Sequence, residues 1–381
     1  MTLMTETTPF NLWLPTRIIF RRGAIETIGQ LASKHGRKAL VITGRTFARK
    51  YGYDAKIRQI LEDSGLTCSF FSDVEPNPTY TTIRKAMEVA SKVQPDVIVA
   101  FGGGSVIDAA KALNVVYTLG GSIEDYVYPK TVDERLTPLI AIPTTHGTGS
   151  EVTKYSVLVD ETNKMKIAVS GDGIYPDYAV LDPLVLNYLP RDQSASTGLD
   201  ALSHAIEAYF SRRSNPYSDL LALEAAGIIF RYLPCAVTGL FECREKVFYA
   251  SMLAGIAINY SGTNLGHGLG YALTVELGLP HGLANAMILP GAARFYEGIL
   301  PAKSETFYLK TGVARPPGGL EEAIQRLKAS VGAPLKLRDL GVTREQLEHY
   351  VKEGLRYQRN LANAPLDVSE SIVRSIFEAV Y

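Results

Sequence analysis

Four residues in the second half of the chain have side chains that could together bind a divalent metal ion. Asp200 and His204 are four residues apart in a segment predicted to be helical, so both side chains leave one face of that helix, about a turn apart. His267 and His281 belong to two further segments. One carboxylate and three imidazoles suit Fe(II) or Zn(II) and leave room for a substrate oxygen. Each residue alone is more often structural, so the predicted metal site rests on the combination.

The residues beside the last two histidines favour the same interpretation. Gly266 and Gly268 flank His267 and free space around its imidazole. Pro280 starts a new element and fixes the entry of His281 into it.

A glycine-rich turn in the first half of the chain could bind a phosphate. It consists of Gly102, Gly103, Gly104 and Ser105, between a predicted strand and a predicted helix. Glycines let the backbone approach a ligand closely, and a helix N-terminus offers free N–H groups and a positive dipole. Ser105 and Asp108 also resemble a capping box. The turn lacks the G-x-G-x-x-G pattern and a tight turn without a ligand is the alternative, but its position favours a pyrophosphate.

Residues 143–151 form a second candidate loop, rich in hydroxyl groups and glycine. These groups suit polar contacts to a nucleotide, whereas an irregular crossover loop is the alternative. His146 lies in this loop, so we expect it nearer to the cofactor than to the metal. Because both loops follow predicted parallel strands, both should lie at the carboxyl edge of one sheet, where open α/β sheets bind ligands.

The end of the second predicted strand bears on the choice of cofactor. An acidic residue at such a strand end often binds the adenosine ribose hydroxyls and repels a 2′-phosphate. This chain has Gly44 followed by Arg45, which would admit that phosphate. We therefore predict a preference for NADP(H) over NAD(H), with an ordinary turn and an exposed arginine as the alternative.

The apolar pattern predicts an α/β domain followed by an all-helical domain. Strands expected at 17–20, 38–43, 68–74, 96–101 and 139–142 alternate with helical segments, which is typical of βαβ units and a parallel sheet. Shorter strands follow at 155–160, 164–169 and 179–181. The segments that follow have apolar residues at helical spacing and are predicted to be helices, at 195–211, 218–232, 244–260, 282–296, 319–331, 343–357 and 368–381. The predicted domains are a dinucleotide-binding α/β domain over 1–187 and a helical metal-binding domain over 188–381.

Composition argues against several classes of function. Lys+Arg and Asp+Glu balance at 39 each, so there is no electrostatic case for a nucleic-acid partner. The longest apolar run, 247–258, is too short to span a membrane, and residues 1–6 lack a signal-peptide pattern. Cys68, Cys235 and Cys243 have no metal or redox spacing, which predicts buried, reduced thiols in a cytoplasmic protein.

Together these motifs resemble the iron-containing (group III) alcohol dehydrogenase family, over essentially the whole chain. The resemblance rests on residues 102–108, 143–151, 198–207 and 280–282. It implies a Rossmann-like N-terminal domain, a helical C-terminal domain of the dehydroquinate-synthase-like type and an active site between them. It also implies reversible hydride transfer between a primary alcohol or diol and NAD(P), with the metal polarising the substrate oxygen, in a homodimer or larger homo-oligomer.

The functional residues of the family can be placed on this chain one by one. Its metal ligands match Asp200, His204, His267 and His281. Its phosphate-binding turn matches residues 102–105, and a position near the adenosine matches Asn77. Its nicotinamide-side and ribose contacts match Thr144, Thr145, Thr148, Thr153 and Lys166. Members with Asp at the place of Gly44 prefer NAD, in agreement with the predicted preference for NADP(H).

One position departs from the family. Many members have a further histidine four residues after the one that matches His267, near the substrate and implicated in proton relay. Here that residue is Tyr271. A phenol has a reference pKa of about 10, which argues against relay at neutral pH and leaves hydrogen bonding or pocket shape as its role. Water, the ribose hydroxyls and His146 are the alternatives for the proton.

Two other functions fit parts of the pattern. A lyase of the dehydroquinate-synthase-like type also pairs a nucleotide with a metal, but it would need Lys and Arg to bind an anionic substrate. The segment around the metal ligands is nearly free of such charges, and Leu265, Leu269, Leu273 and Val275 indicate an apolar pocket. A non-catalytic nucleotide-binding protein would not need a complete set of metal ligands. A small alcohol or aldehyde is therefore the expected partner.

Overall fold

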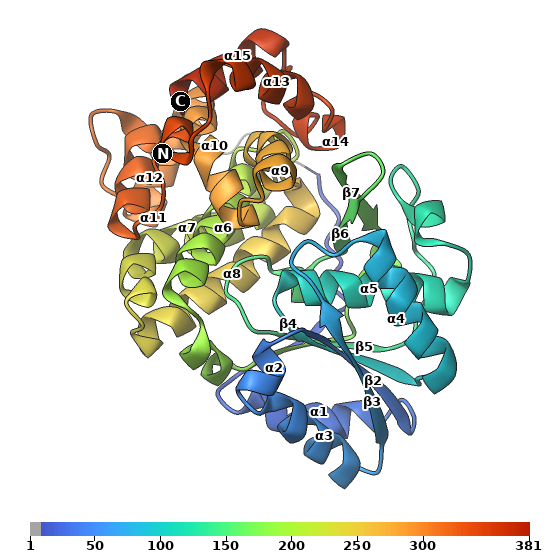
Figure 1. Cartoon of the computed structure of the whole chain (residues 1–381). Coiled ribbons are helices and arrows are strands. Elements are labelled where there is room, and N and C mark those ends of the chain that lie inside the picture. Colours follow the sequence, from blue (N-terminus) through green and yellow to red (C-terminus); the bar gives the residue numbers. More distant parts are fainter. Residues whose placement is uncertain (1–8) are drawn as a thin grey trace. The chain divides into compact units, whose positions relative to one another are not determined.

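The computed structural model describes residues 9–381, which divide into two compact units (Figure 1). The α/β unit comprises Leu14–Thr145 and Ser150–Leu189. The helical unit comprises Pro190–Tyr381 together with His146–Gly149 and the described residues 9–13. Residues 146–149 therefore do not belong to the α/β unit, in which the sequence placed them. Residues 1–6, which lack a signal-peptide pattern, lie outside the described part of the chain.

Parallel strands form the main sheet of the α/β unit, in the order β1-β8-β5-β4-β2-β3. Their bounds are β1 Arg17–Phe20, β2 Lys38–Gly44, β3 Thr67–Val74, β4 Val97–Gly102, β5 Leu139–Pro143 and β8 Tyr178–Leu181. β6 Tyr155–Asp160 and β7 Met165–Ser170 pair as a separate antiparallel hairpin. The strands predicted from the sequence are confirmed, with small shifts at their ends.

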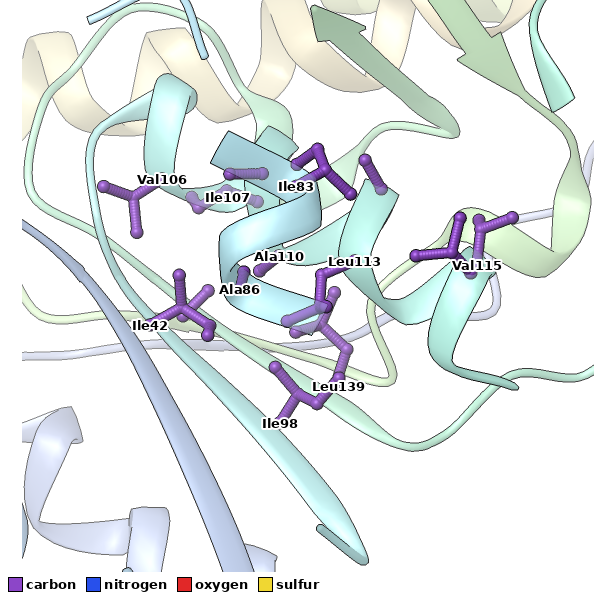
Figure 2. Packing of buried hydrophobic residues seen from close by; sticks show 14 of the residues in the cluster. Ile42, Ile83, Ala86, Ile98, Val106, Ile107, Ala110, Leu113, Val115 and Leu139 are labelled. Carbon is purple, nitrogen blue, oxygen red and sulfur yellow. The ribbon is translucent and has the colours of Figure 1, made fainter. Parts of the chain in front are cut away.

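Helices cover both faces of this sheet (Figure 1). They are α1 Ile28–Ala32, α2 Phe47–Lys50, α3 Tyr53–Asp63, α4 Tyr80–Val93 and α5 Gly104–Leu119. On one face, Ile83 of α4 and Ile107 of α5 pack with Ile42, Ile98 and Leu139 of the strands (Figure 2). Helices α1 and α3 contact the strands as well as each other. Because the central strands are buried on both sides, their sequences are continuous apolar runs rather than alternating patterns.

The register of the parallel strands places three strand ends side by side. Gly102 at the end of β4 pairs with Pro143 at the end of β5, and Phe101 of β4 pairs with Thr43 of β2. Both candidate loops and Gly44 therefore leave the same carboxyl edge of the sheet. The expectation that the two loops share one edge is confirmed.

The helical unit begins with the helix that carries Asp200 and His204. Its helices are α6 Arg191–Tyr209, α7 Pro216–Val237, α8 Phe241–Ser261, α9 Leu265–Leu277, α10 His281–Ile299, α11 Pro301–Thr311, α12 Gly319–Ser330, α13 Arg344–Gly354, α14 Gln358–Leu361 and α15 Glu370–Ala379. Helix α6 packs against α7, α8 and α10, and α9 packs against α10 and α13. The segments that carry the four predicted metal ligands thus belong to one packed group of helices.

The sequence does not predict α9, because three of its residues are poor helix formers. Gly266, Gly268 and Gly270 each lower helix propensity by about 1 kcal/mol relative to alanine. The helix forms nevertheless because Asn264 caps it, with Oδ1 accepting from the N–H of Leu265 at 2.7 Å, and because it packs on α10 and α13. Tertiary packing here outweighs local propensity.

Helix α7 is long and apolar enough to cross a membrane by length and composition alone. The core helix of a soluble protein passes the same test, and α7 packs against α6, α8 and α11. Its most apolar window is 39% buried, so these contacts account for part of its apolar character.

The prediction of reduced cysteines is wrong for two of the three. Cys235 near the end of α7 and Cys243 near the start of α8 form a disulfide, with their Cα atoms 5.8 Å apart. The turn between the two helices brings the two cysteines together, which their sequence spacing alone does not reveal. Cys68 is a free thiol and is partly exposed.

Candidate functional site

Helices α6, α9 and α10 bring three predicted metal ligands together. Asp200 lies in α6, His267 lies in the first turn of α9 and His281 is the first residue of α10. One ligand atom from each of them lies within 4.8 Å of the other two. Nε2 of His267 is 3.7 Å, and Nε2 of His281 is 3.9 Å, from Oδ1 of Asp200. These distances are too long for hydrogen bonds but are close to the separation of two ligands on one ion.

His204, the fourth predicted ligand, lies beside this group rather than within it. Its ring stacks on that of His267, with the ring centroids 4.6 Å apart. Its Nδ1 is buried and has no hydrogen-bond partner among residues 9–381. A buried polar atom without a partner is costly, and a metal ion is one way to satisfy it. The chemistry of the four donors therefore fits a divalent metal.

Burial and neighbouring charges keep Asp200 and His204 in the protonation states that bind a cation. Burial alone would raise the pKa of Asp200, but the neighbouring imidazoles, His204 foremost, and a hydrogen bond from Asn285 lower it to about 2. Burial lowers the pKa of His204 to about 4. At neutral pH the carboxylate is therefore ionised and the imidazole is neutral, as metal binding requires.

Glu207 and Asn285 belong to the site although the sequence did not single them out. Oε1 of Glu207 is 2.6 Å from Nδ1 of His267. Nδ2 of Asn285 donates to Oδ1 of Asp200 at 2.9 Å and lies 3.2 Å from Nε2 of His281. Helical spacing was the available signal, because Glu207 follows Asp200 by seven residues and Asn285 follows His281 by four.

Tyr271 lies one turn after His267 in α9 and is buried. Its ring stacks on that of His281 with centroids 5.5 Å apart, and it meets Tyr357 edge-on at 5.0 Å. Burial raises the pKa of its phenol well above the ordinary value. The phenol therefore stays protonated at neutral pH and can donate a hydrogen bond.

His146 is fully buried in the helical unit, against the helix that carries Asp200. Its Nε2 is 3.0 Å from Oγ of Ser194, and its Nδ1 is 3.3 Å from Oγ1 of Thr197. The backbone passes very close to α6 here, since a Cβ on Gly147 would lie 2.6 Å from Cβ of Thr197. Burial lowers the pKa of His146 to about 4. These contacts indicate that His146 braces α6, and the lowered pKa argues against it as a proton acceptor at neutral pH.

The glycine-rich turn leaves the N-terminus of α5 without a side-chain cap. A Cβ on Gly103 would lie 3.3 Å from the side chain of Thr145, so the two candidate loops approach each other closely. Oγ of Ser105 accepts from the backbone N–H of Asn77 at 3.2 Å, and Asn77 has a φ of 56°. The uncapped N-terminus of a long helix, at the carboxyl edge of a parallel sheet, fits the pyrophosphate of a dinucleotide.

Asp108 anchors the second loop from within α5. Its carboxylate accepts from Oγ of Ser150 and from the N–H of Val157. One turn later, Nζ of the buried Lys111 donates to the carbonyl oxygens of Ser150 at 2.6 Å and of Thr153 at 2.7 Å. Burial raises the pKa of Asp108 and lowers that of Lys111 to about 8. The sequence suggested a cofactor contact for Asp108 and missed Lys111, although a lysine inside an apolar helix was a signal.

The other predicted cofactor residues have different surroundings. Thr144 directly follows β5, and its N–H donates the last hydrogen bond between β5 and β4, to the carbonyl oxygen of Gly102 at 3.0 Å. Lys166 is buried in β7, and its charge acts on Asp108. Thr148 lies in the segment 146–149 and therefore belongs to the helical unit, unlike the rest of the set.

Comparisons with known proteins cover nearly the whole chain. Residues 15–183 match the family model for iron-containing alcohol dehydrogenase, and residues 194–381 match the C-terminal model of the Fe-containing alcohol dehydrogenase family. The chain is 31% identical to the NAD-dependent methanol dehydrogenase of Bacillus methanolicus, over 97% of this chain and 100% of that protein. It is also 31% identical to the NADPH-dependent butanol dehydrogenase of Clostridium saccharobutylicum, over 97% of each. The crystal structure of an iron-containing alcohol dehydrogenase from Thermotoga maritima is similar with a TM-score of 0.88 and 36% identity, covering 98% of this chain and 99% of that one.

Proposed function

The chain belongs to the iron-containing alcohol dehydrogenase family, and we propose that it interconverts a primary alcohol or diol and the matching aldehyde with iron and NADP(H). The class of reaction follows from the family: a metal-dependent hydride transfer between a CH–OH group and NAD(P). The substrate, the metal and the cofactor preference are our proposal. The main observation in its support is that ligand atoms of Asp200, His267 and His281 lie within 4.8 Å of one another.

The donors at this site suit iron. One carboxylate and three imidazoles are ligands that Fe(II) and Zn(II) both accept, and the family favours iron. When bound, the divalent ion acts as a Lewis acid on the alcohol or carbonyl oxygen. The chain holds the donors in place through hydrogen bonds, from Asn285 to Asp200 and between Glu207 and His267.

The surroundings of the metal ligands support a small, uncharged substrate. The side chain of His281 is 24% exposed, whereas that of Asp200 is 3% exposed, so we propose that substrate approaches beside His281. The aromatic ring of Tyr271 packs on this imidazole. We propose that Tyr271 shapes the pocket, and that the proton leaves through water or the ribose hydroxyls rather than through a histidine.

Gly44 supports the preference for NADP(H). A Cβ at this position would meet its nearest atom, the carbonyl oxygen of Val74, at 3.6 Å, so the site has room for a larger residue but carries no carboxylate. The neighbouring Arg45 donates to Oδ1 of Asp73 at 2.7 Å and lies 3.7 Å from Oε2 of Glu75. Arg45 is 55% exposed, and exposed ion pairs contribute only about 0–1 kcal/mol, so a 2′-phosphate can compete for its guanidinium.

The lyase alternative is not favoured. Methanol dehydrogenase and butanol dehydrogenase match nearly the whole chain, and each is named for oxidation of a primary alcohol. We further propose a homodimer or larger homo-oligomer in the cytoplasm, in keeping with the family resemblance alone.

A substrate panel tests this proposal. Iron-loaded protein is assayed with a series of linear aldehydes, 1,3-propanediol and primary alcohols, each with NADP(H) and with NAD(H). We expect turnover of short primary alcohols and their aldehydes, with the higher kcat/KM for NADP(H). A higher kcat/KM for NAD(H) would overturn the cofactor proposal, and no turnover of any alcohol or aldehyde would overturn the reaction.

A further inference from the structure

The carboxylate of Glu207 in α6 is buried and is bound by Asn264, which caps α9, and by His267 in its first turn. The side chain is 0% exposed. Oε1 lies 2.6 Å from Nδ1 of His267, and Oε2 accepts from the N–H of Asn264 at 2.5 Å and from the N–H of His267 at 3.3 Å. A buried carboxylate is costly unless such partners surround it, and the N-terminus of a helix is a favourable place for negative charge. Glu207 thus ties the metal-ligand segment of α9 to α6.

Further hydrogen bonds hold this contact in one geometry. Nδ2 of Asn264 donates to the carbonyl oxygen of Glu207 at 2.9 Å, and the hydroxyl of the fully buried Tyr296 in α10 donates to Oδ1 of Asn264. The same Asn264 oxygen caps α9. The position of the Glu207 carboxylate is therefore determined by groups from three helices.

The contact defines which nitrogen of His267 carries the proton. A carboxylate accepts hydrogen bonds, so Nδ1 of His267 is the N–H donor toward Glu207. The lone pair then lies on Nε2, the atom 3.7 Å from Oδ1 of Asp200. A carboxylate behind a ligating histidine typically fixes its tautomer and raises its basicity. We propose that Glu207 is a positioning residue that fixes the tautomer and orientation of His267 for metal binding; this rests on the metal site of the proposed function.

Gly266 is the residue that makes this contact sterically feasible. A Cβ on Gly266 would lie 2.5 Å from Oε1 of Glu207 and 3.0 Å from its Cδ, so any side chain there displaces the carboxylate. A Cβ on Gly268 would instead meet Cδ2 of Leu361 at 3.1 Å, and Glu207 is not among its near neighbours. The two glycines flank the same histidine but differ in this one contact. Neither has a positive φ, so alanine is compatible with the backbone at both positions.

This pair provides a matched experiment with metal binding as the readout. Metal-free wild-type protein and the variants Glu207→Gln, Gly266→Ala and Gly268→Ala are titrated with zinc against a chromophoric chelator. Removing a carboxylate behind a ligand typically weakens metal affinity by about 10–100-fold. We expect a loss of this size for Glu207→Gln and Gly266→Ala, and a zinc affinity for Gly268→Ala within about threefold of wild type. In imidazole nitrogen NMR spectra, the Nδ1-protonated form of His267 should dominate in wild type and in Gly268→Ala. It should not dominate in Glu207→Gln or in Gly266→Ala.

A further variant separates positioning from general stability. Tyr308→Phe removes the hydrogen bond from its phenol to Oε1 of Glu297 at 2.8 Å, which lies outside the contact between Glu207 and His267. It should therefore lower the unfolding temperature while leaving the zinc affinity near that of wild type. Wild-type zinc affinity in both Glu207→Gln and Gly266→Ala, or equal losses in Gly266→Ala and Gly268→Ala, would overturn the role of Glu207. If wild-type protein itself binds no zinc, the metal site of the proposed function fails, and this inference fails with it.

Discussion

Nε2 of His267 in α9 lies 3.7 Å from Oδ1 of Asp200 in α6. Two ligands that each stand about 2.1 Å from one ion are about 3.5 Å apart in a tetrahedral arrangement. The observed separation is therefore close to that of two ligands on a shared metal and too long for a hydrogen bond. Two side chains far apart in sequence meet at this distance because α6 and α9 pack together.

Replacing either residue should remove the metal and the activity. Asp200→Asn and His267→Ala each delete one donor, and we expect a loss of bound metal with a fall in kcat/KM of at least about 100-fold, since Lewis-acid stabilisation is worth several kcal/mol. Metal content and kinetics measured on the same preparations check this. His349→Ala is the control, because His349 is exposed and pairs with Glu276. Full activity in Asp200→Asn would contradict the assignment.

Gly44→Asp should shift cofactor preference toward NADH. A carboxylate at the end of β2 would accept hydrogen bonds from the ribose hydroxyls and repel a 2′-phosphate. We expect the ratio of kcat/KM for NADPH to that for NADH to fall by about tenfold or more, equivalent to about 1.4 kcal/mol. Gly44→Asn provides the neutral control of similar size. An unchanged ratio in Gly44→Asp would show that this position does not face the cofactor.

Tyr271→Phe should leave the pH profile of activity unchanged. Burial raises the pKa of this phenol, so it stays protonated across the working range and removal of its hydroxyl deletes no titrating group. Tyr271→Ala should instead raise KM, because the ring that packs on His281 and Tyr357 is lost. Steady-state kinetics across pH distinguish the two variants. Loss of one limb of the pH profile in Tyr271→Phe would assign the phenol to proton transfer.

His146 should make the protein less stable in acid. Its folded pKa is about 4 and its unfolded value is 6.5, so between these values the unfolded chain binds more protons than the folded one. Stability should therefore fall as pH decreases from about 6.5 to about 4, by up to about 3 kcal/mol from this group. Urea unfolding of wild type and His146→Asn across this range measures it. The variant should lose less stability in acid than wild type; equal slopes would contradict the buried, neutral state of His146.

Much of the fold could be predicted because its signals are local and periodic. The central parallel strands are continuous apolar runs, and most of the helices from α6 onward match segments predicted to be helical, the exceptions being α9, α11 and α14. Helix α9 escaped prediction because Gly266, Gly268 and Gly270 weaken the local signal, and packing restores the helix. The disulfide between Cys235 and Cys243 depends on the geometry of a helix–helix turn, which the sequence pattern does not contain.

The residues proposed as metal ligands could be selected from the sequence for a similar reason, whereas the residues that support them could not. Asp200 and His204 share a helical face that spacing alone reveals, and the histidines of α9 and α10 are recognisable by type. The hydrogen bond between Glu207 and His267 joins two helices, so it requires the tertiary fold. His146 illustrates the same limit: its loop follows a strand of the α/β unit, yet the histidine packs on α6 through Ser194 and Thr197.

The most direct test is the activity of one protein preparation with and without its metal. Protein is stripped with a chelator, its metal content is measured, and alcohol oxidation is assayed before and after addition of Fe(II). We expect metal-free protein to bind NADPH, seen by nucleotide fluorescence, but to lose at least about 100-fold in kcat, as expected when Lewis-acid stabilisation worth several kcal/mol is removed. Addition of Fe(II) should restore kcat to the value measured before the metal was removed. Full activity in protein shown to contain no metal would contradict the metal-dependent mechanism.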